Sequence, residues 1–289
     1  MNLLSIIKLM RPQQYIKNLF IFLPLFFALK ITDVTLLLND FIAFVAFSIT
    51  ASAIYILNDY HDIEEDRQHP RKKYRPLASG EISKAQAVRI MGILATVGFV
   101  LMAVLSLQAV GILTIYVLLN IAYSFYLKHV AILDVAIIAI GFVLRLFIGA
   151  AVTNIELSMW IVVMTFLLAL FMALAKRRDD VLIYMETGKK MRKVIDGYNL
   201  QFLDTAMAIM ASVVIVAYTI YTTSPDVIER FHTQYLYLTS LFVILGIMRY
   251  LQIAFVHLDS GSPTKIVFKD RFIQLVLLGW IITFAGILY

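Results

Sequence analysis

Five acidic side chains gather within nine residues of the chain, from Asn58 to Asp66. If a helix continues through this segment, Asn58, Asp62 and Asp66 are spaced four residues apart and share one face. Carboxylates on one face repel each other unless a cation lies on it, and their hard oxygen atoms suit Mg²⁺. In proteins Mg²⁺ takes one or two carboxylates and completes its shell with water and substrate phosphate oxygens. The segment therefore predicts a metal-diphosphate site.

A basic run follows the acidic one. Residues 71–76 read Arg-Lys-Lys-Tyr-Arg-Pro, and guanidinium and ammonium groups neutralise and hydrogen-bond phosphate. We therefore expect this run to hold the phosphate charge that the metal leaves uncompensated.

The composition places these residues in a membrane protein. Of the 289 residues, 61% are hydrophobic and 15% are charged, and the mean hydropathy is +0.86; soluble domains carry roughly 25% charged residues. Nine apolar stretches are close to the ~20 residues that a helix needs to cross a bilayer. They lie near residues 16–31, 40–57, 88–107, 109–127, 131–153, 158–175, 204–223, 235–257 and 271–289. The expected fold is all-α: a polytopic bundle of nine transmembrane helices around a central cavity open to the cytoplasmic side.

Lysine and arginine are distributed asymmetrically about these stretches. Of the 25 such residues, 21 fall in the N-terminal segment and the even-numbered connections, and an excess of positive charge marks cytoplasmic loops. We expect a multi-pass protein of the inner (plasma) membrane, with its N-terminus in the cytoplasm and its C-terminus outside. Topology alone then explains the pI of about 9.3 without a nucleic-acid partner. The absence of cysteine excludes disulfides and thiolate chemistry.

Two connections on the expected cytoplasmic side, about 58–87 and 176–203, are longer than the roughly 4–6 residues of a typical connection. Both mix acidic with basic residues, and the second begins Lys-Arg-Arg-Asp-Asp at 176–180. Functional residues are frequent in such loops. We therefore expect a single domain over residues 1–289, with these two loops forming a polar cap.

Several segments resemble a known family. The pattern NDxxDxxxD at 58–66 is similar to the first aspartate-rich motif of the UbiA-type intramembrane prenyltransferase superfamily. The segments RPQQYIKN at 11–18 and HPRKKYRP at 69–76 resemble its decaprenyl-phosphate phosphoribosyltransferase branch, as do Tyr123-Ser124, Leu133-Asp134 and Arg145. The resemblance covers nearly the whole chain. The second aspartate-rich motif of the superfamily usually reads DxxxD, and Asp179-Asp180 replaces it here. This departure favours a donor other than prenyl diphosphate.

The resemblance implies a Mg²⁺-dependent transfer of 5-phosphoribose from phosphoribosyl diphosphate to a long-chain polyprenyl phosphate, with release of diphosphate. The alternative is a prenyltransferase that moves a prenyl group from prenyl diphosphate to an aromatic or other polar acceptor. A transporter is disfavoured, because its coupling acids are expected at the bilayer midplane. The partners implied are the two substrates and the lipid bilayer, and a homo-oligomer is compatible with the resemblance.

The chemistry of the residues and the family resemblance together give the expected site residues. Asn58, Asp62 and Asp66 are predicted to be catalytic through metal binding, and Asp59 is a further candidate ligand. The residues predicted to bind substrate are Lys17, Asn18, Tyr74, Arg75, Tyr123, Lys128, Arg145, Lys176 and Arg177. Topology alone also accounts for several of these charges.

Arg145 stands apart from the other predicted phosphate contacts, because an arginine inside a span costs roughly 2.5–3.5 kcal/mol on insertion scales. We expect it to line the polar cavity, and pairing with Asp134, eleven residues earlier, is the structural alternative.

Overall fold

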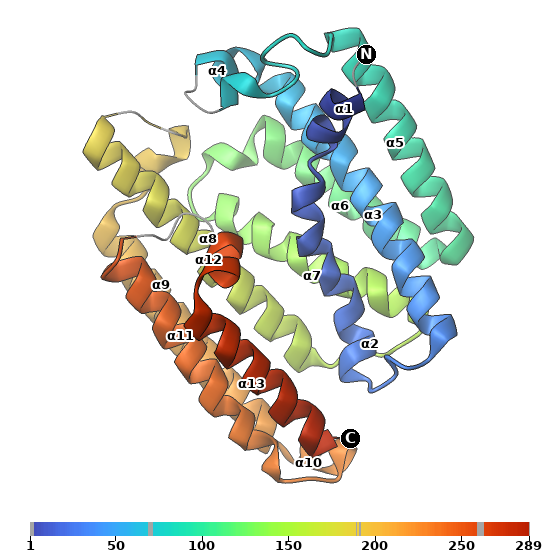
Figure 1. Ribbon diagram of the computed structural model, residues 1–289, viewed down its shortest axis with the longest axis vertical. Coiled ribbons are helices and arrows are strands. Elements are labelled where there is room, and N and C mark those ends of the chain that lie inside the picture. The colour runs from blue at the N-terminus through green and yellow to red at the C-terminus, as the bar shows by residue number, and fades with distance from the viewer. Residues whose placement is uncertain (1–2, 69–71, 189, 191, 259–262, 289) are drawn as a thin grey trace. The chain divides into compact units, whose positions relative to one another are not determined.

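The computed structural model describes residues 3–68, 72–188, 190, 192–258 and 263–288 (Figure 1). Every regular element in these residues is a helix, which confirms the all-α prediction. Eight helices in the described part are long and apolar enough to cross a membrane. They are α3 (Val34–His61), α5 (Lys84–Leu105), α6 (Leu107–Phe125), α7 (Leu133–Thr153), α8 (Met159–Thr187), α9 (Leu200–Thr223), α11 (Ser240–Phe255) extended by the 3₁₀ helix η5 (Tyr235–Thr239), and α13 (Arg271–Leu288).

The remaining elements are short. They are α1 (Leu3–Met10), η1 (Pro12–Phe22), α2 (Leu23–Phe27), α4 (Ile63–Gln68), η2 (Lys72–Tyr74), η3 (Leu127–His129), η4 (Lys193–Gly197), α10 (Pro225–Phe231) and α12 (Pro263–Lys269).

The first predicted span is not a continuous α-helix, so the count of nine is not confirmed. Its residues form the 3₁₀ helix η1 and then the five-residue helix α2. Proline lies near the start of both pieces, Pro12 in η1 and Pro24 in α2. Because proline lacks an N–H group and clashes with the preceding turn, it is tolerated at a helix start and disrupts a helix interior.

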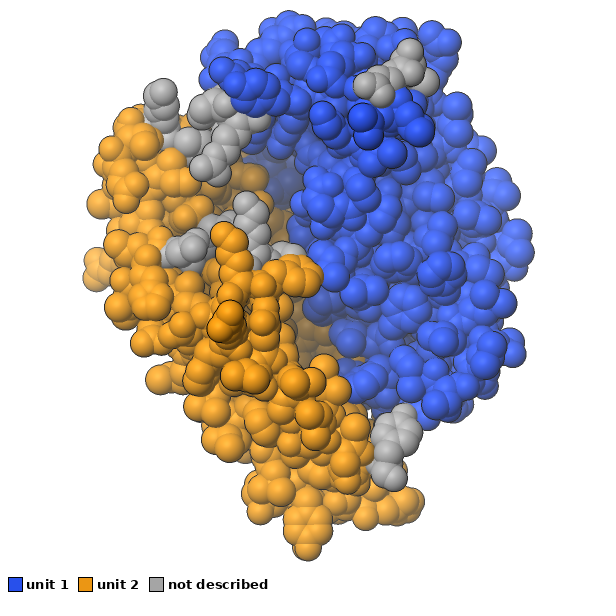
Figure 2. All heavy atoms as spheres, viewed as in Figure 1, with its two compact units in different colours: residues 1–128, 140–158 blue, residues 129–139, 159–289 orange. Residues whose placement is uncertain are grey.

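The chain divides into two compact units, which are coloured separately in Figure 2. The first contains residues 1–128 and 140–158. Its core gathers Phe47, Met102, Leu113 and Ile148, and α3 packs along α5 (Figure 1). The contact is close at Gly98, where an added Cβ would lie 2.8 Å from the carbonyl oxygen of Ala46. A second small cluster, which includes Leu9, Ile56 and Ile82, packs α1 against the C-terminal end of α3.

The second unit contains residues 129–139 and 159–289. Here α8 packs against α9, and α11 against α13. Phe171, Leu203, Met207 and Tyr250 belong to its core, and the rings of Phe171 and Tyr250 meet edge to face with centroids 5.3 Å apart. Near the other end of these helices, Trp280 donates a 2.7 Å hydrogen bond from Nε1 to the hydroxyl of Tyr218.

Large apolar side chains cover the outer faces of the long helices. Val104, Leu107 and Leu275 are between 68% and 81% exposed, which in a soluble protein would form an interaction surface. On helices of membrane-spanning length these side chains face lipid instead. The protein is therefore a multi-pass membrane protein.

Candidate active site

The acidic segment lies at the junction of α3 and α4, in the first unit. Asp62 caps the C-terminus of α3, and its backbone φ and ψ of −94° and 12° leave the helical region. Helical hydrogen bonds nevertheless continue through the junction: Asp62 N–H donates to the carbonyl of Asn58 at 3.0 Å, and Asp66 N–H to that of Asp62 at 2.8 Å. Residues four or seven positions apart therefore remain neighbours across the junction.

Asp59 and Asp66, seven residues apart, form one pair of carboxylates. Nη1 of Arg75 bridges them, 2.9 Å from Oδ1 of Asp59 and 2.6 Å from Oδ2 of Asp66. Arg11 also donates to Asp59, and Nζ of Lys72 lies 3.7 Å from Asp66. Both carboxylates are only 2% exposed. The structure thus brings Asp59 into the same cluster as Asp66, held by the basic run that follows the motif.

Asn58 and Asp62 form a second pair. Nδ2 of Asn58 lies 3.3 Å from Oδ2 of Asp62, and Lys128 donates from Nζ to Oδ1 of Asp62 at 2.8 Å. His61 lies 3.1 Å from the same oxygen. Burial by itself raises the pKa of Asp62, but the hydrogen bonds and charges of Lys128 and His61 outweigh it, so the pKa of this carboxyl is lowered and it is ionised at neutral pH.

The motif residues therefore lie in two pairs rather than in one row. No group of three His, Asp or Glu side chains in the described part of the chain is gathered closely enough to hold a metal alone. This arrangement fits Mg²⁺, which needs only one or two carboxylates besides water and phosphate oxygens. The pairs supply oxygen donors of the required kind. In addition, the site contains more cations than carboxylates: Arg11, Lys72, Arg75 and Lys128 contact Asp59, Asp62 and Asp66.

Arg145 lies deeper in the same unit and is 5% exposed. Its Nε donates to Oδ1 of Asn18 at 2.8 Å, and its Nη1 donates to the carbonyl of Gly141 at 2.5 Å. Asn18 in turn donates to the hydroxyl of Ser48 on α3 at 2.8 Å. The guanidinium carbon lies 4.6 Å from the ring centroid of Phe47. The structure thus links the predicted residues Asn18 and Arg145 directly.

The rings of Tyr116 and Phe142 complete the surroundings of Arg145, each 5.3 Å from its guanidinium carbon. The pairing with Asp134 that sequence spacing allowed is not formed, because Asp134 contacts other residues.

Asp134 belongs to a buried cluster in the second unit. It is fully buried, accepts a hydrogen bond from Nε of Arg177, and accepts another from the hydroxyl of Tyr198 at 2.6 Å. Nη1 of Arg177 lies 2.8 Å from Oδ2 of Asp180. Burial, followed by the hydrogen bond to Asp134, raises the pKa of Tyr198, so it is a neutral donor. Arg177 is 1% exposed and is held between two carboxylates.

The other predicted substrate contacts are more exposed. Lys176 is exposed within α8, Tyr74 is 70% exposed with Lys73 over its ring, and Tyr123 is half-buried in α6. Of the basic segment 69–76 that carried the resemblance, residues 69–71 lie outside the described part.

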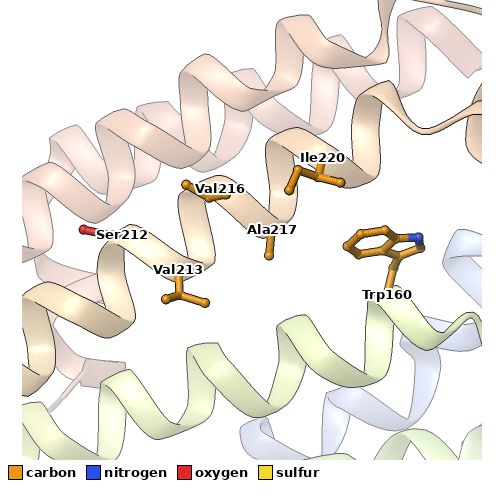
Figure 3. A pocket seen from close by; sticks show the side chains of 6 residues that line it. All are labelled: Trp160, Ser212, Val213, Val216, Ala217 and Ile220. Atoms are coloured by element: carbon orange, nitrogen blue, oxygen red, sulfur yellow. The ribbon is translucent and has the colours of Figure 1, made fainter.

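A shallow apolar groove lies between α8 and α9 in the second unit (Figure 3). Its volume is about 360 Å³, and its lining residues are Trp160, Ser212, Val213, Val216, Ala217 and Ile220. Ser212 is its one polar lining residue, and its hydroxyl donates to the carbonyl of Ala208 at 2.9 Å. The groove offers hydrocarbon contact and no group that could perform acid, base or metal chemistry.

The family follows from comparison with known proteins. The model of the UbiA prenyltransferase family matches residues 19–278. The chain belongs to this family. The decaprenyl-phosphate phosphoribosyltransferase of Mycolicibacterium smegmatis is 32% identical, over all of this chain and 94% of the relative. The 4-hydroxybenzoate octaprenyltransferase of Pseudoalteromonas translucida is 27% identical, over 71% of this chain and 75% of the relative.

The UbiA fold is also seen in solved structures. A UbiA homologue from Archaeoglobus fulgidus, bound to DMAPP and Mg²⁺, superposes with a TM-score of 0.73 and 19% identity over 97% of this chain and 98% of that one. At this identity the likeness establishes the fold of this UbiA-family chain.

Several contacts in this family member were not predicted as site contacts from sequence. Arg11 contacts a motif carboxylate, and Ser48, Asp134 and Tyr198 support predicted residues. Arg11 lies in the segment that carried the resemblance, so its position was a usable signal. Ser48 and Tyr198 carry no such signal, because a hydroxyl in a helical or loop sequence has many structural roles.

Proposed function

We propose that the protein transfers 5-phosphoribose from phosphoribosyl diphosphate to a polyprenyl phosphate of decaprenyl type and releases diphosphate. The observation that carries this proposal is the 32% identity to a decaprenyl-phosphate phosphoribosyltransferase over the whole chain. The excess of cations around the acidic motif supports it, because both substrates are phosphate esters.

The reaction replaces one C–O bond by another at C1 of the ribose. The bond to diphosphate breaks with its electrons on the leaving oxygen, while an oxygen of the acceptor phosphate forms the new bond to C1. Negative charge accumulates on the leaving group, so preorganised cations accelerate the step. Bound Mg²⁺ supplies Lewis-acid stabilisation of that charge. Asn58, Asp62 and Asp66, with Asp59, are the residues that would hold it.

Arg75, Lys72 and Lys128 are proposed to contact the diphosphate. Each already lies against a motif carboxylate, at 2.6–3.7 Å, so a small side-chain movement suffices to reach phosphate oxygens beside those carboxylates. The acceptor phosphate is ionised at neutral pH and needs positioning rather than a general base. Lys17, Asn18 and Arg145 are proposed to contact a substrate phosphate, together with Tyr74 and Tyr123.

Arg177 is proposed to have a structural role and not to contact substrate from solvent. It is buried in α8 between Asp134 and Asp180, ten residues before that helix ends at Thr187, and it joins α8 to the first turn of α7. Lys176, its exposed neighbour, is the residue of this pair that can meet a phosphate.

The setting proposed for this reaction is the inner membrane. The N-terminus lies in the cytoplasm, and homo-oligomers are allowed. The segments 58–87 and 176–203, which were expected to be loops but include the ends of α3, α5, α8 and α9, form a cytoplasmic polar cap over one transmembrane domain. This orientation follows from the asymmetric lysine and arginine distribution and gives the soluble donor access from the cytoplasm.

A second candidate is prenyl transfer to an aromatic acceptor. The 27% identity to a 4-hydroxybenzoate octaprenyltransferase favours it. The absence of a DxxxD pattern at Asp179-Asp180 argues against it.

The test is a substrate panel on the purified protein in nanodiscs with Mg²⁺. One arm contains phosphoribosyl diphosphate with polyprenyl phosphates of several chain lengths, and the other contains polyprenyl diphosphate with 4-hydroxybenzoate. The proposal predicts a phosphoribosylated lipid in the first arm alone. A prenylated aromatic acid, without the first product, would replace the proposal by the second candidate.

A further inference from the structure

Two positive charges in the first unit lack an acidic partner among the described residues. The guanidinium of Arg145 contacts an amide oxygen, a backbone carbonyl and aromatic rings, but no carboxylate. Lys17 immediately precedes Asn18, the residue that holds Arg145, and no hydrogen bond or ion pair engages its ammonium group within the described part. The charges of Arg145 and Arg11 repel it.

Lys17 and Arg145 lie far from the proposed metal site, toward the N-terminal end of α3. The 3₁₀ helix η1 runs antiparallel to α3, because residues later in η1 meet residues earlier in α3. Arg11 contacts Asp59, the hydroxyl oxygens of Tyr15 and Ser52 lie 2.8 Å apart, and Asn18 contacts Ser48. Eleven residues of α3 separate Ser48 from Asp59, which corresponds to roughly 16 Å along the helix. The Lys17–Arg145 level is therefore inside the span of α3 rather than at its cytoplasmic end.

Such an arrangement is costly without an anion. A charge buried in a low-dielectric environment normally has a counter-ion, since its hydration is lost. The aromatic rings and the amide of Asn18 compensate Arg145 in part. Lys17 has no such compensation, and its neighbours Arg11 and Arg145 add repulsion.

We propose that Lys17 and Arg145 form a subsite for a phosphate monoester, separate from the metal-diphosphate site at the end of α3. A monoester dianion matches two adjacent cations, and ammonium and guanidinium groups both bind phosphate by charge-assisted hydrogen bonds. This inference deepens the proposed function, because both of its substrates carry such a group: the 5-phosphate of the ribose donor and the phosphate of the lipid acceptor. Both esters offer the same chemistry to the subsite, and the experiment separates them.

The experiment measures binding without turnover. Full-length protein in nanodiscs, without Mg²⁺, is titrated with three probes: ribose 5-phosphate, decaprenyl phosphate, and decaprenol as the phosphate-free control. The variants are Lys17→Gln, Lys17→Arg and the control Lys30→Gln, which changes an exposed lysine after α2. Thermal unfolding of each variant checks that it is folded.

The proposal predicts that Lys17→Gln weakens binding of one phosphate probe by about tenfold or more, whereas Lys30→Gln leaves it unchanged. Lys17→Arg, which keeps the charge, retains more of the binding than Lys17→Gln. Loss for ribose 5-phosphate assigns the subsite to the donor, and loss for decaprenyl phosphate relative to decaprenol assigns it to the acceptor.

Three results would overturn the subsite: wild-type affinity of Lys17→Gln for both probes, no binding of either phosphate by the wild type, or equal losses in Lys17→Gln and Lys17→Arg. Phosphoribosyl transfer by the wild type is measured separately with Mg²⁺ and both substrates. The subsite can therefore fail while the proposed function stands, and the reverse.

Discussion

Nζ of Lys128 lies 2.8 Å from Oδ1 of Asp62, although 66 residues separate them in the chain. The lysine thus occupies one carboxylate oxygen that the proposed Mg²⁺ site needs. The same relationship holds for Arg75 with Asp59 and Asp66. In this structure basic side chains of the protein neutralise the carboxylates of the acidic motif. When the substrates bind, Mg²⁺ and these basic side chains must share the carboxylate oxygens and the phosphate oxygens.

The first prediction concerns this competition. Lys128→Gln removes a cation from Asp62, so the metal affinity measured without substrate should rise several-fold, while the KM for phosphoribosyl diphosphate should also rise because a phosphate contact is lost. Mn²⁺ binding followed by electron paramagnetic resonance gives the first quantity, and steady-state kinetics the second. The control Lys8→Gln changes an exposed lysine of α1 and should alter neither. Weaker metal binding in Lys128→Gln would contradict the competition.

The second prediction separates the motif's buried and exposed acids. Asp66→Asn removes the charge that holds Arg75 and Lys72, and the transfer rate should fall by at least roughly 10–100-fold. Glu64→Gln changes a side chain that is 73% exposed and paired only at the surface with Arg67, so its rate should stay within about twofold of the wild type. Equal effects of the two variants on kcat/KM would show that the two carboxylate pairs do not define the site.

The local part of the site could be predicted from sequence, because the acidic residues and the basic run lie within one stretch at a helix end. The pairing inside it could not. Asp66 lies with Asp59 rather than in a row with Asn58 and Asp62, since Arg75 bridges the first two, and a bridge of this kind depends on how the following loop folds back.

Contacts between residues far apart in the sequence could not be predicted, for a related reason. Arg11 reaches Asp59, and Arg177 rather than Arg145 takes Asp134, because helix packing sets which side chains meet. The membrane-spanning helices followed from hydrophobic length alone. The first span was the exception, because hydropathy does not distinguish an α-helix from a 3₁₀ helix interrupted by proline.

The third prediction tests the packing that places Arg145. A Cβ at Gly149 of α7 would lie 1.9 Å from the carbonyl oxygen of Ile21, whereas one at Gly111 of α6 would meet nothing within 4 Å. Gly149→Ala should therefore destabilise the protein by roughly 1–3 kcal/mol or more, and Gly111→Ala should be neutral or stabilise it by up to ~1 kcal/mol. Unfolding in mixed detergent micelles measures both. A neutral Gly149→Ala would mean that η1 and α7 are not in close contact.

The fourth prediction concerns the buried cluster around Arg177. Asp134→Asn removes the charge of one of the carboxylates that hold the Arg177 guanidinium, while Asp180 remains. The expected loss of stability is about 3 kcal/mol, at the lower end of the range for breaking a buried pair, because one partner remains. Asp226→Asn, at an exposed position of α10, is the control and should cost less than about 0.5 kcal/mol. Similar unfolding curves for the two variants would contradict a structural role for Asp134.

The fifth prediction concerns Asp40, a fully buried residue of α3. Both of its carboxylate oxygens lack a hydrogen-bond partner among the described residues. Because an unsatisfied buried polar group costs roughly 1–3 kcal/mol, Asp40→Leu should stabilise the protein by an amount in that range. Asp40→Asn keeps a buried polar group and should give little or none of the gain. A large destabilisation by Asp40→Leu would indicate that Asp40 has a polar partner.

The most direct test of the proposed chemistry follows where each part of the donor goes. Purified protein in nanodiscs receives Mg²⁺, decaprenyl phosphate and phosphoribosyl diphosphate labelled either in the ribose carbons or in the diphosphate. The account predicts that the ribose label enters the lipid phase while the diphosphate label is released as free diphosphate in water, and that lipid labelling and diphosphate release are both lost in Asp62→Asn. Lipid without ribose label, or equal transfer by wild type and Asp62→Asn, would contradict phosphoribosyl transfer at this motif.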